Sequence, residues 1–188
     1  MIDLTNAAAD IQNFIEDKGW EFYFIGGLTV QVWGQPRLTR DIDLTIFTNL
    51  VDETKYISAF LERYKPKFHD AEKFALTNRV LPMFTETGIG IDVTLSGISD
   101  GSQALDRSSY QPYTESINLR ICSPDDLIIM KTVAARPQDW MDIESVIIRQ
   151  DHLDWPYIEC TLEGLTAYED MTDRLNRLAN LKSVFYRK

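Results

Sequence analysis

Two segments of the chain alternate between apolar and polar residues, which is the pattern of a half-buried β-strand. The first runs from Asp41 to Phe47 and places its aliphatic residues on one face and Asp41 and Asp43 on the other. The second lies within residues 79–95, which the pattern predicts to be a hairpin that turns at residues 86–88. Asp92 falls on the polar face of its second strand, and Pro82 predicts that its first strand lies at a sheet edge.

The remaining periodicities predict helices and short strands. Apolar residues spaced by three and four predict a helix over residues 4–15, and a further helix ends before Pro66. Short strands are predicted over residues 20–25 and 116–122, a short helix over 28–33, and a loop over the Ser-, Gly- and Asp-rich residues 97–113. We therefore expect an α/β (α+β) region, with a mixed sheet flanked by helices, over residues 1–122.

The pattern changes after Cys122. Ser123 and Pro124 form a helix start, since Ser caps the first free N–H groups and Pro suits the first helical position. A second helix is expected to begin at Pro137, and two more follow within residues 158–178. Residues 123–188 are thus predicted to form a helical region.

Composition narrows the classes of function. The 188 residues carry 29 Asp plus Glu against 19 Lys plus Arg, a formal charge of −10, which disfavours generic binding to the phosphate backbone of nucleic acids. Only residues 171–188 are basic, and they are either the solvated face of a last helix or an RNA contact. The two cysteines show no metal or disulfide spacing, and no signal peptide or membrane span is recognisable, so we expect a cytoplasmic protein without a membrane partner.

Three carboxylates stand out as candidate metal ligands. Asp41 and Asp43 project from the same strand face, about 6.5 to 7 Å apart at the backbone, and Asp92 joins them if its strand lies in the same sheet. Uncompensated, such carboxylates repel one another, and Mg²⁺ is the hard cation that commonly resolves this repulsion. The alternative is that each Asp is an ordinary solvated strand residue.

A glycine pair, Gly26-Gly27, follows the first predicted strand and precedes the short helix. At such a junction, backbone N–H groups and the helix dipole can meet a phosphate, although a tight turn is the commoner explanation of a glycine pair. Neither the P-loop nor the dinucleotide-binding glycine pattern is present, so Walker-type ATPases and dinucleotide enzymes are not supported.

Taken together, FIGGLTVQVWGQPRLTRDIDLTIF, residues 24–47, resembles the signature of the DNA polymerase β nucleotidyltransferase superfamily. In it, 13 residues separate Gly27 from Asp41, and IDVTL around Asp92 matches the third carboxylate-bearing strand. Within the superfamily the sequence is most similar to the AbiEii-like toxins, through Arg37-x-Thr39-Arg40-Asp41-x-Asp43 and the later segment LIIMKTVAARPQDWMDIESVI. The resemblance covers roughly residues 20 to 165.

The resemblance implies an enzyme that moves an NMP from an NTP to a hydroxyl group and releases pyrophosphate. Asp41 and Asp43 would hold the metal that grips the triphosphate, and Asp92 would complete a second metal site, giving a two-metal Mg²⁺ centre. Gly26 and Gly27 would cradle the phosphates.

The same resemblance implies that the helical region, residues 123–188, completes the nucleotide and acceptor site, and it implies roles for residues outside the strands. Lys131, Arg40 and Arg136 would bind the nucleotide and offset charge on its phosphates, and Asp142 would orient Lys131 or assist the acceptor. Structural roles are equally available for these residues. Lys131 follows core-like residues and can extend its ammonium to water, while Asp139 and Asp142 lie in the first turns of a helix, where acids are favoured.

Other functions remain open at this stage. A relative that keeps the fold but acts as a binding partner or antitoxin is expected to have lost metal carboxylates, and a nucleotide-sugar glycosyltransferase would use Asp41-x-Asp43 without the upstream glycines. The acceptor could be tRNA, protein or a small molecule such as an aminoglycoside, because an acidic protein attracts cationic compounds. A toxin would also imply a cognate antitoxin as partner.

Overall fold

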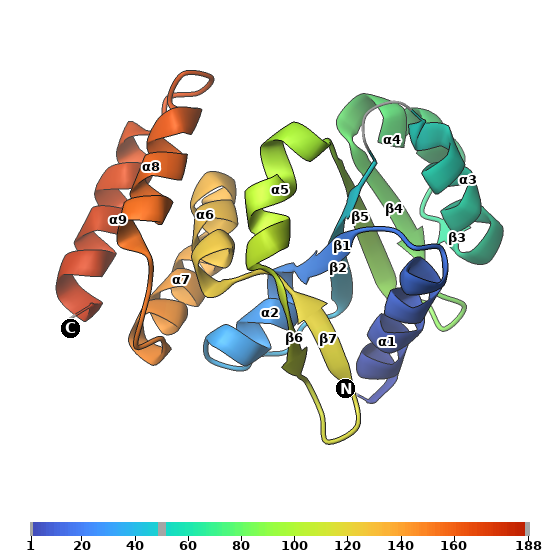
Figure 1. Cartoon of the computed structure of the whole chain (residues 1–188), viewed down its shortest axis with the longest axis horizontal. Coiled ribbons are helices and arrows are strands. Elements are labelled where there is room, and N and C mark those ends of the chain that lie inside the picture. Colours follow the sequence, from blue (N-terminus) through green and yellow to red (C-terminus); the bar gives the residue numbers. More distant parts are fainter. Residues whose placement is uncertain (1, 49–51, 187–188) are drawn as a thin grey trace. The chain divides into compact units, whose positions relative to one another are not determined.

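The computed structural model describes residues 2–48 and 52–186, with the side chains of residues 2, 3 and 98–102 excepted. The chain divides into two compact units (Figure 1). Unit 1 comprises Met1–Leu28 and Leu38–Cys122, and unit 2 comprises Thr29–Arg37 and Ser123–Lys188. A segment of the N-terminal half therefore belongs with the C-terminal helices.

Unit 1 is built on a mixed seven-stranded sheet in the order β3-β4-β5-β2-β1-β7-β6. Its strands are β1 (Phe22–Ile25), β2 (Asp41–Phe47), β3 (Lys65–Pro66), β4 (Val80–Phe84), β5 (Gly90–Ser96), β6 (Ser109–Pro112) and β7 (Asn118–Ile121). β2 runs parallel to β5 and antiparallel to β1, and β1 runs parallel to β7. The predicted mixed sheet flanked by helices is confirmed.

Helices α1 (Ile2–Asp17), α3 (Glu53–Arg63), α4 (Ala71–Asn78) and α5 (Ile98–Arg107) complete unit 1, together with the start of α2 (Gly26–Trp33). Phe14 of α1 packs edge-on against Phe60 of α3, with ring centroids 5.4 Å apart. Ile42, Leu44 and Ile46 of β2 are fully buried, and each such side chain contributes about 1.5–3 kcal/mol of hydrophobic free energy. This apolar face of β2 fixes the direction of the opposite face, which carries Asp41 and Asp43.

Unit 2 is helical after Cys122, with α6 (Pro124–Ala134), α7 (Pro137–Arg149), α8 (Trp155–Leu165) and α9 (Thr172–Phe185). Ser123 caps α6 by accepting a hydrogen bond from the Asp126 N–H, as its sequence predicts. The remainder of α2 belongs to this unit, and the Gln150 side chain donates to the Trp33 carbonyl oxygen at 2.7 Å. The predicted helices after Ser123 and Pro137 are both present.

Two predictions of local structure are wrong, and one helix was missed. Residues 97–113 are not a loop, because they contain α5 and β6. The two-residue β3 lies outside β4, so Pro82 is one strand away from the edge, and α4 was not predicted at all. The polar composition of α5 suggested a loop instead of a helix. In α4 only Ala71 and Ala75 are buried, so its apolar stripe is too weak to predict a helix from the sequence.

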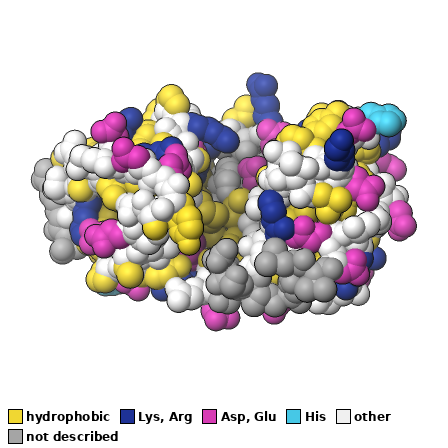
Figure 2. Space-filling view, turned by 90° about the horizontal axis from the view of Figure 1, so that it is seen from above, with side chains coloured by type: hydrophobic (Ala, Val, Ile, Leu, Met, Phe, Trp, Pro, Cys, Tyr) yellow, Lys and Arg dark blue, Asp and Glu magenta, His cyan; other side chains and the backbone are white. Residues whose placement is uncertain are grey.

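The surface carries both signs of charge. On the face seen in Figure 2, Lys and Arg side chains lie interspersed with Asp and Glu and form no continuous basic patch. In the basic segment, Arg174 pairs with Glu169 at 2.8 Å and Lys182 with Glu159 at 2.6 Å, while Arg187 and Lys188 lie outside the described residues. Within residues 2–48 and 52–186, no helix has the length and apolar character needed to cross a membrane.

Candidate functional site

The sheet of unit 1 brings the three predicted metal ligands to one face. β2 and β5 are parallel and in register, with Asp43 directly beside Asp92 and Asp41 beside Gly90. Side chains at paired positions of neighbouring strands point to the same face, and the strands are about 4.8 Å apart. Asp41 is exposed and Asp43 half-buried, whereas Thr45, two residues further, is buried, so the carboxylates lie at the open end of this face.

Two glycines make room for these carboxylates. Gly26 has a φ of +68°, a conformation that costs glycine little, and a Cβ at this position would overlap the Asp43 carboxylate. A Cβ on Gly90 would overlap the Asp41 carboxylate. Both carboxylates therefore lie close to the backbone of a glycine. A larger residue in place of either glycine would prevent this close approach.

The second glycine of the pair has a different environment. Gly27 is buried, and the Thr39 side chain fills the space that a Cβ on Gly27 would occupy. The structure therefore gives Gly27 a packing contact as well as its place in the first turn of α2. Arg40, the other residue of this segment predicted to bind nucleotide, is exposed.

A lysine that the sequence did not indicate joins the aspartates. Lys67 lies just after β3, and its Nζ donates to the Asp92 Oδ1 at 2.8 Å. Lys67 and Asp92 are 25 residues apart, and no local pattern marks the pairing. The sheet topology brings the two residues together, because β3 pairs with β4 and β4 pairs with β5.

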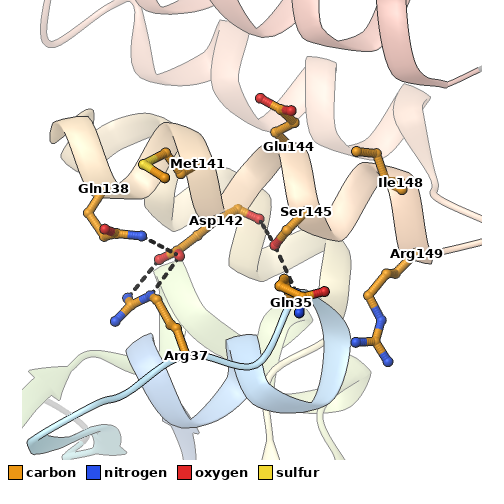
Figure 3. Close-up of a pocket in the computed structure, with 9 residues that line it drawn as sticks. All are labelled: Gln35, Arg37, Gln138, Met141, Asp142, Glu144, Ser145, Ile148 and Arg149. Atoms are coloured by element: carbon orange, nitrogen blue, oxygen red, sulfur yellow. Dashed lines mark hydrogen bonds and ion pairs between the residues drawn. The ribbon is translucent and has the colours of Figure 1, made fainter.

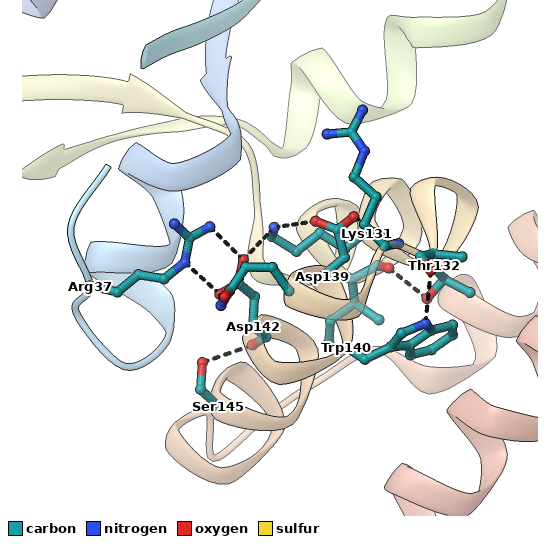
Figure 4. Close-up of polar contacts among 11 residues, drawn as sticks. Arg37, Lys131, Thr132, Asp139, Trp140, Asp142 and Ser145 are labelled. Atoms are coloured by element: carbon teal, nitrogen blue, oxygen red, sulfur yellow. Dashed lines mark hydrogen bonds and ion pairs between the residues drawn. The ribbon is translucent and has the colours of Figure 1, made fainter. Parts of the chain in front are cut away.

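The predicted residues of unit 2 form a second, buried group (Figure 4). Lys131 donates to Asp139 at 2.9 Å and to Asp142 at 2.6 Å. Arg37 grips the same Asp142 carboxylate with two hydrogen bonds, at 2.7 and 2.8 Å. The Lys131 side chain is 7% exposed and that of Asp142 2%, so the structural alternative, in which Lys131 extends to water, is not observed.

These contacts hold Asp142 ionised. Burial alone would raise the pKa of the Asp142 carboxyl, but hydrogen bonds from Arg37 and Lys131 outweigh burial and set its pKa below the ordinary value. Asp139 also accepts from the Arg136 N–H at 3.1 Å, as expected of an acid in the first turn of a helix. The Arg136 residue itself is exposed.

A cavity of about 410 Å³ borders this group within unit 2 (Figure 3). Arg37 and Asp142 lie at its wall, and Ser145 receives a hydrogen bond from the Gln35 N–H at 3.0 Å. The exposed side chains of Met141 and Ile148 add apolar surface. The cavity thus combines apolar surface with charged and hydrogen-bonding groups.

The candidate residues fall into one group in each unit. Asp41, Asp43 and Asp92 come together in unit 1, with Gly26 and Gly27 at the start of α2, and Lys67 was missed by sequence reasoning. In unit 2, Arg37 joins Lys131, Asp139 and Asp142, and the sequence had indicated no role for Arg37 in this group.

Comparison with known proteins identifies a family that matches nearly the whole chain. Residues 2–186 match the family described as "Nucleotidyltransferase of unknown function (DUF6036)". No curated protein matches the chain in sequence.

Solved structures share the fold at low sequence identity. The antibiotic-resistance factor ANT(2'')-Ia has a TM-score of 0.62 at 12% identity, covering 93% of this chain and 97% of its own. An antigenic nucleotidyltransferase-like protein from Paracoccidioides brasiliensis has a TM-score of 0.54 at 13% identity, covering 94% and 92%. The lincosamide antibiotic adenylyltransferase LnuA, solved with lincomycin bound, has a TM-score of 0.51 at 18% identity, covering 72% and 91%.

Proposed function

This chain belongs to the nucleotidyltransferase family that it matches, and we propose that it moves an NMP from an NTP to a hydroxyl acceptor with the help of Mg²⁺. The observation that carries the proposal is the in-register placement of Asp43 beside Asp92, with Asp41 on the same face. A relative that had become only a binding partner or antitoxin would have no need of three carboxylates at one open end of a sheet.

The donor set suits a hard divalent cation. Asp41 and Asp43 offer carboxylate oxygens on one face, and the glycine spaces at Gly26 and Gly90 admit them close to the backbone. Among the described residues, no group of three or more His, Cys, Asp and Glu side chains is placed to hold a metal by itself. This agrees with Mg²⁺ sites that use one or two carboxylates and take further oxygens from substrate phosphates and water.

The residues of unit 1 would have different roles in NMP transfer. Asp41 and Asp43 bind the cation, which when present neutralises charge on the triphosphate. The first N–H groups of α2, after Gly26, lie at the positive end of the helix dipole, which favours a phosphate. The acceptor oxygen then forms a bond to the α-phosphorus as the bond to the β-phosphate oxygen breaks, and pyrophosphate leaves. Asp92 is the carboxylate available near this face to take the proton of the hydroxyl group.

For unit 2 the contacts support a positioning role. Asp142 accepts hydrogen bonds from both Lys131 and Arg37. Arg37 lies four residues before Asp41 in the chain. We propose that this buried group holds Arg37 in place. Direct contact of Lys131, Arg136 or Arg40 with the nucleotide remains a prediction from the family resemblance.

The proposed acceptor is a small molecule with a hydroxyl group. Two proteins of the same fold are named for antibiotic modification or resistance, and the net charge of −10 favours cationic compounds. Arg174 and Lys182 are paired with acids, which leaves them less suited to RNA phosphates. The AbiEii-like resemblance supports the alternative of a toxin that modifies tRNA or protein and has a cognate antitoxin.

The acceptor is tested by product analysis. The protein is incubated with each NTP and Mg²⁺, together with a panel of aminoglycosides and lincosamides in one reaction and total RNA in another. We expect a compound of the panel to gain the mass of one NMP in mass spectrometry. A gain on RNA alone contradicts the acceptor but leaves NMP transfer in place, and labelling of the protein or of added extract proteins points to the toxin-like alternative.

A further inference from the structure

The ammonium group of Lys67 lies beside Asp92, the residue to which the family resemblance assigns a second metal ion. Its Nζ is 2.8 Å from the Asp92 Oδ1, and the Lys67 and Asp92 side chains are 23% and 36% exposed. The pair is therefore partly shielded from water, so its attraction is weakened less by solvent and salt than that of a fully exposed pair.

Contacts with β4 hold Lys67 in place. Its backbone N–H donates to the Pro82 carbonyl oxygen at 3.0 Å, directly after the pairing of Pro66 with Met83. Its Nζ also lies 5.5 Å from the centre of the Phe84 ring, a distance at which a cation is attracted to the ring face. These contacts on β4 direct the ammonium toward β5.

The same ammonium reaches the neighbourhood of a second carboxylate. The Nζ of Lys67 and the Asp41 Oδ1 both border the space above Gly90 that a Cβ would fill, with the Nζ 3.4 Å from that position. Asp43 follows Asp41 by two residues on β2 and lies beside Asp92 of the neighbouring strand β5. Lys67 thus supplies one fixed positive charge to a face that carries three negative ones.

We propose that Lys67 takes the place of one divalent cation at Asp92, so that the enzyme works with a single Mg²⁺ bound by Asp41 and Asp43. The inference rests on the proposed NMP transfer and specifies its metal requirement. Lys67 is a positioning residue that keeps Asp92 in place and partly offsets its charge without a second ion, so that Asp92 stays an ionised carboxylate. A further cation at Asp92 would meet the ammonium at close range, and the like charges would repel.

The wild-type protein tests this directly. Mn²⁺ binding is measured by electron paramagnetic resonance with an equimolar, non-hydrolysable α,β-methylene NTP, and the number of Mn²⁺ ions per chain is counted. We expect one. Two ions per chain overturn the role of Lys67 while leaving NMP transfer intact, and none with any of the four nucleotides overturns the proposed function itself.

Variants then assign the effect to the ammonium. Lys67→Met is expected to bind a second Mn²⁺ ion, Lys67→Arg to keep one, and the exposed Lys65→Met, on the neighbouring strand β3, to keep one as a matched loss of charge. Circular dichroism confirms that each variant is folded. A folded Lys67→Met that still binds one ion contradicts the inference, and the wild-type count stands even if this variant does not fold.

Discussion

Replacing Asp43 by Asn is expected to lower the rate of NMP transfer on the order of 10³-fold, the scale of losing one well-placed electrostatic group in an active site. The amide keeps the size of the side chain but removes a negative charge from the pair that binds Mg²⁺, at the position in register with Asp92. The measurement is the rate of pyrophosphate release at saturating NTP and Mg²⁺.

Two comparisons keep this result specific. Asp10→Asn removes a carboxylate that pairs with Arg63 elsewhere in unit 1, and its rate should stay within about twofold of wild type. Gly26→Ala leaves every charge in place but pushes a Cβ into the Asp43 carboxylate, so it should also lose activity, by about 10²-fold. Gly19 has nearly the same φ, +66°, with nothing near its Cβ position, so Gly19→Ala measures the backbone strain alone. Equal activity of the two alanine variants contradicts the proposed importance of the Gly26 space.

Asp142→Asn is expected to destabilise the protein by about 3 kcal/mol, the scale of breaking a buried ion pair. Lys131 would keep Asp139 as partner, but Arg37 would lose the carboxylate that accepts two of its hydrogen bonds. The free energy of unfolding from urea titration checks this. The matched control is Glu144→Gln on the same helix, half-buried at the cavity wall, which should change it by less than about 0.5 kcal/mol.

The same carboxyl predicts a pH dependence. Because its pKa is lower in the folded protein than in the unfolded chain, Asp142 contributes stability above the unfolded pKa, about 4, and loses it as the pH falls through the folded value. Wild type should therefore lose more stability than Asp142→Asn as the pH is lowered from 5 to below about 4. Parallel pH profiles for the two proteins would show that Asp142 is not held ionised.

The strands that carry the candidate site could be predicted because their signal is local. Alternation over Asp41 to Phe47 fixes which side chains are buried, and the burial of Ile42, Leu44 and Ile46 agrees with it. The same alternation placed Asp92 on the polar face of its strand. The pairing of β2 with β5 brings the two faces together, and the sequence supplied this only through the family resemblance.

The contacts that sequence reasoning missed are long-range. Arg37 and Asp142 are 105 residues apart, and Lys67 and Asp92 are 25 apart, so no periodicity links either pair. The structural alternative for Lys131 was extension of its ammonium to water, yet this ammonium contacts two buried carboxylates. The helix α5 was missed because Ser, Gly and Asp favour turns locally, and tertiary packing overrides such preferences.

The most direct test of NMP transfer uses two parallel reactions that contain Mg²⁺ and an acceptor that the protein modifies. The NTP is labelled at the α-phosphorus in one reaction and at the γ-phosphorus in the other. We predict that label at the α-phosphorus moves to the acceptor, that label at the γ-phosphorus leaves as pyrophosphate, and that Asp43→Asn slows both on the order of 10³-fold. Transfer of the γ-label to the acceptor, or α-label transfer that persists in excess EDTA, would contradict the account.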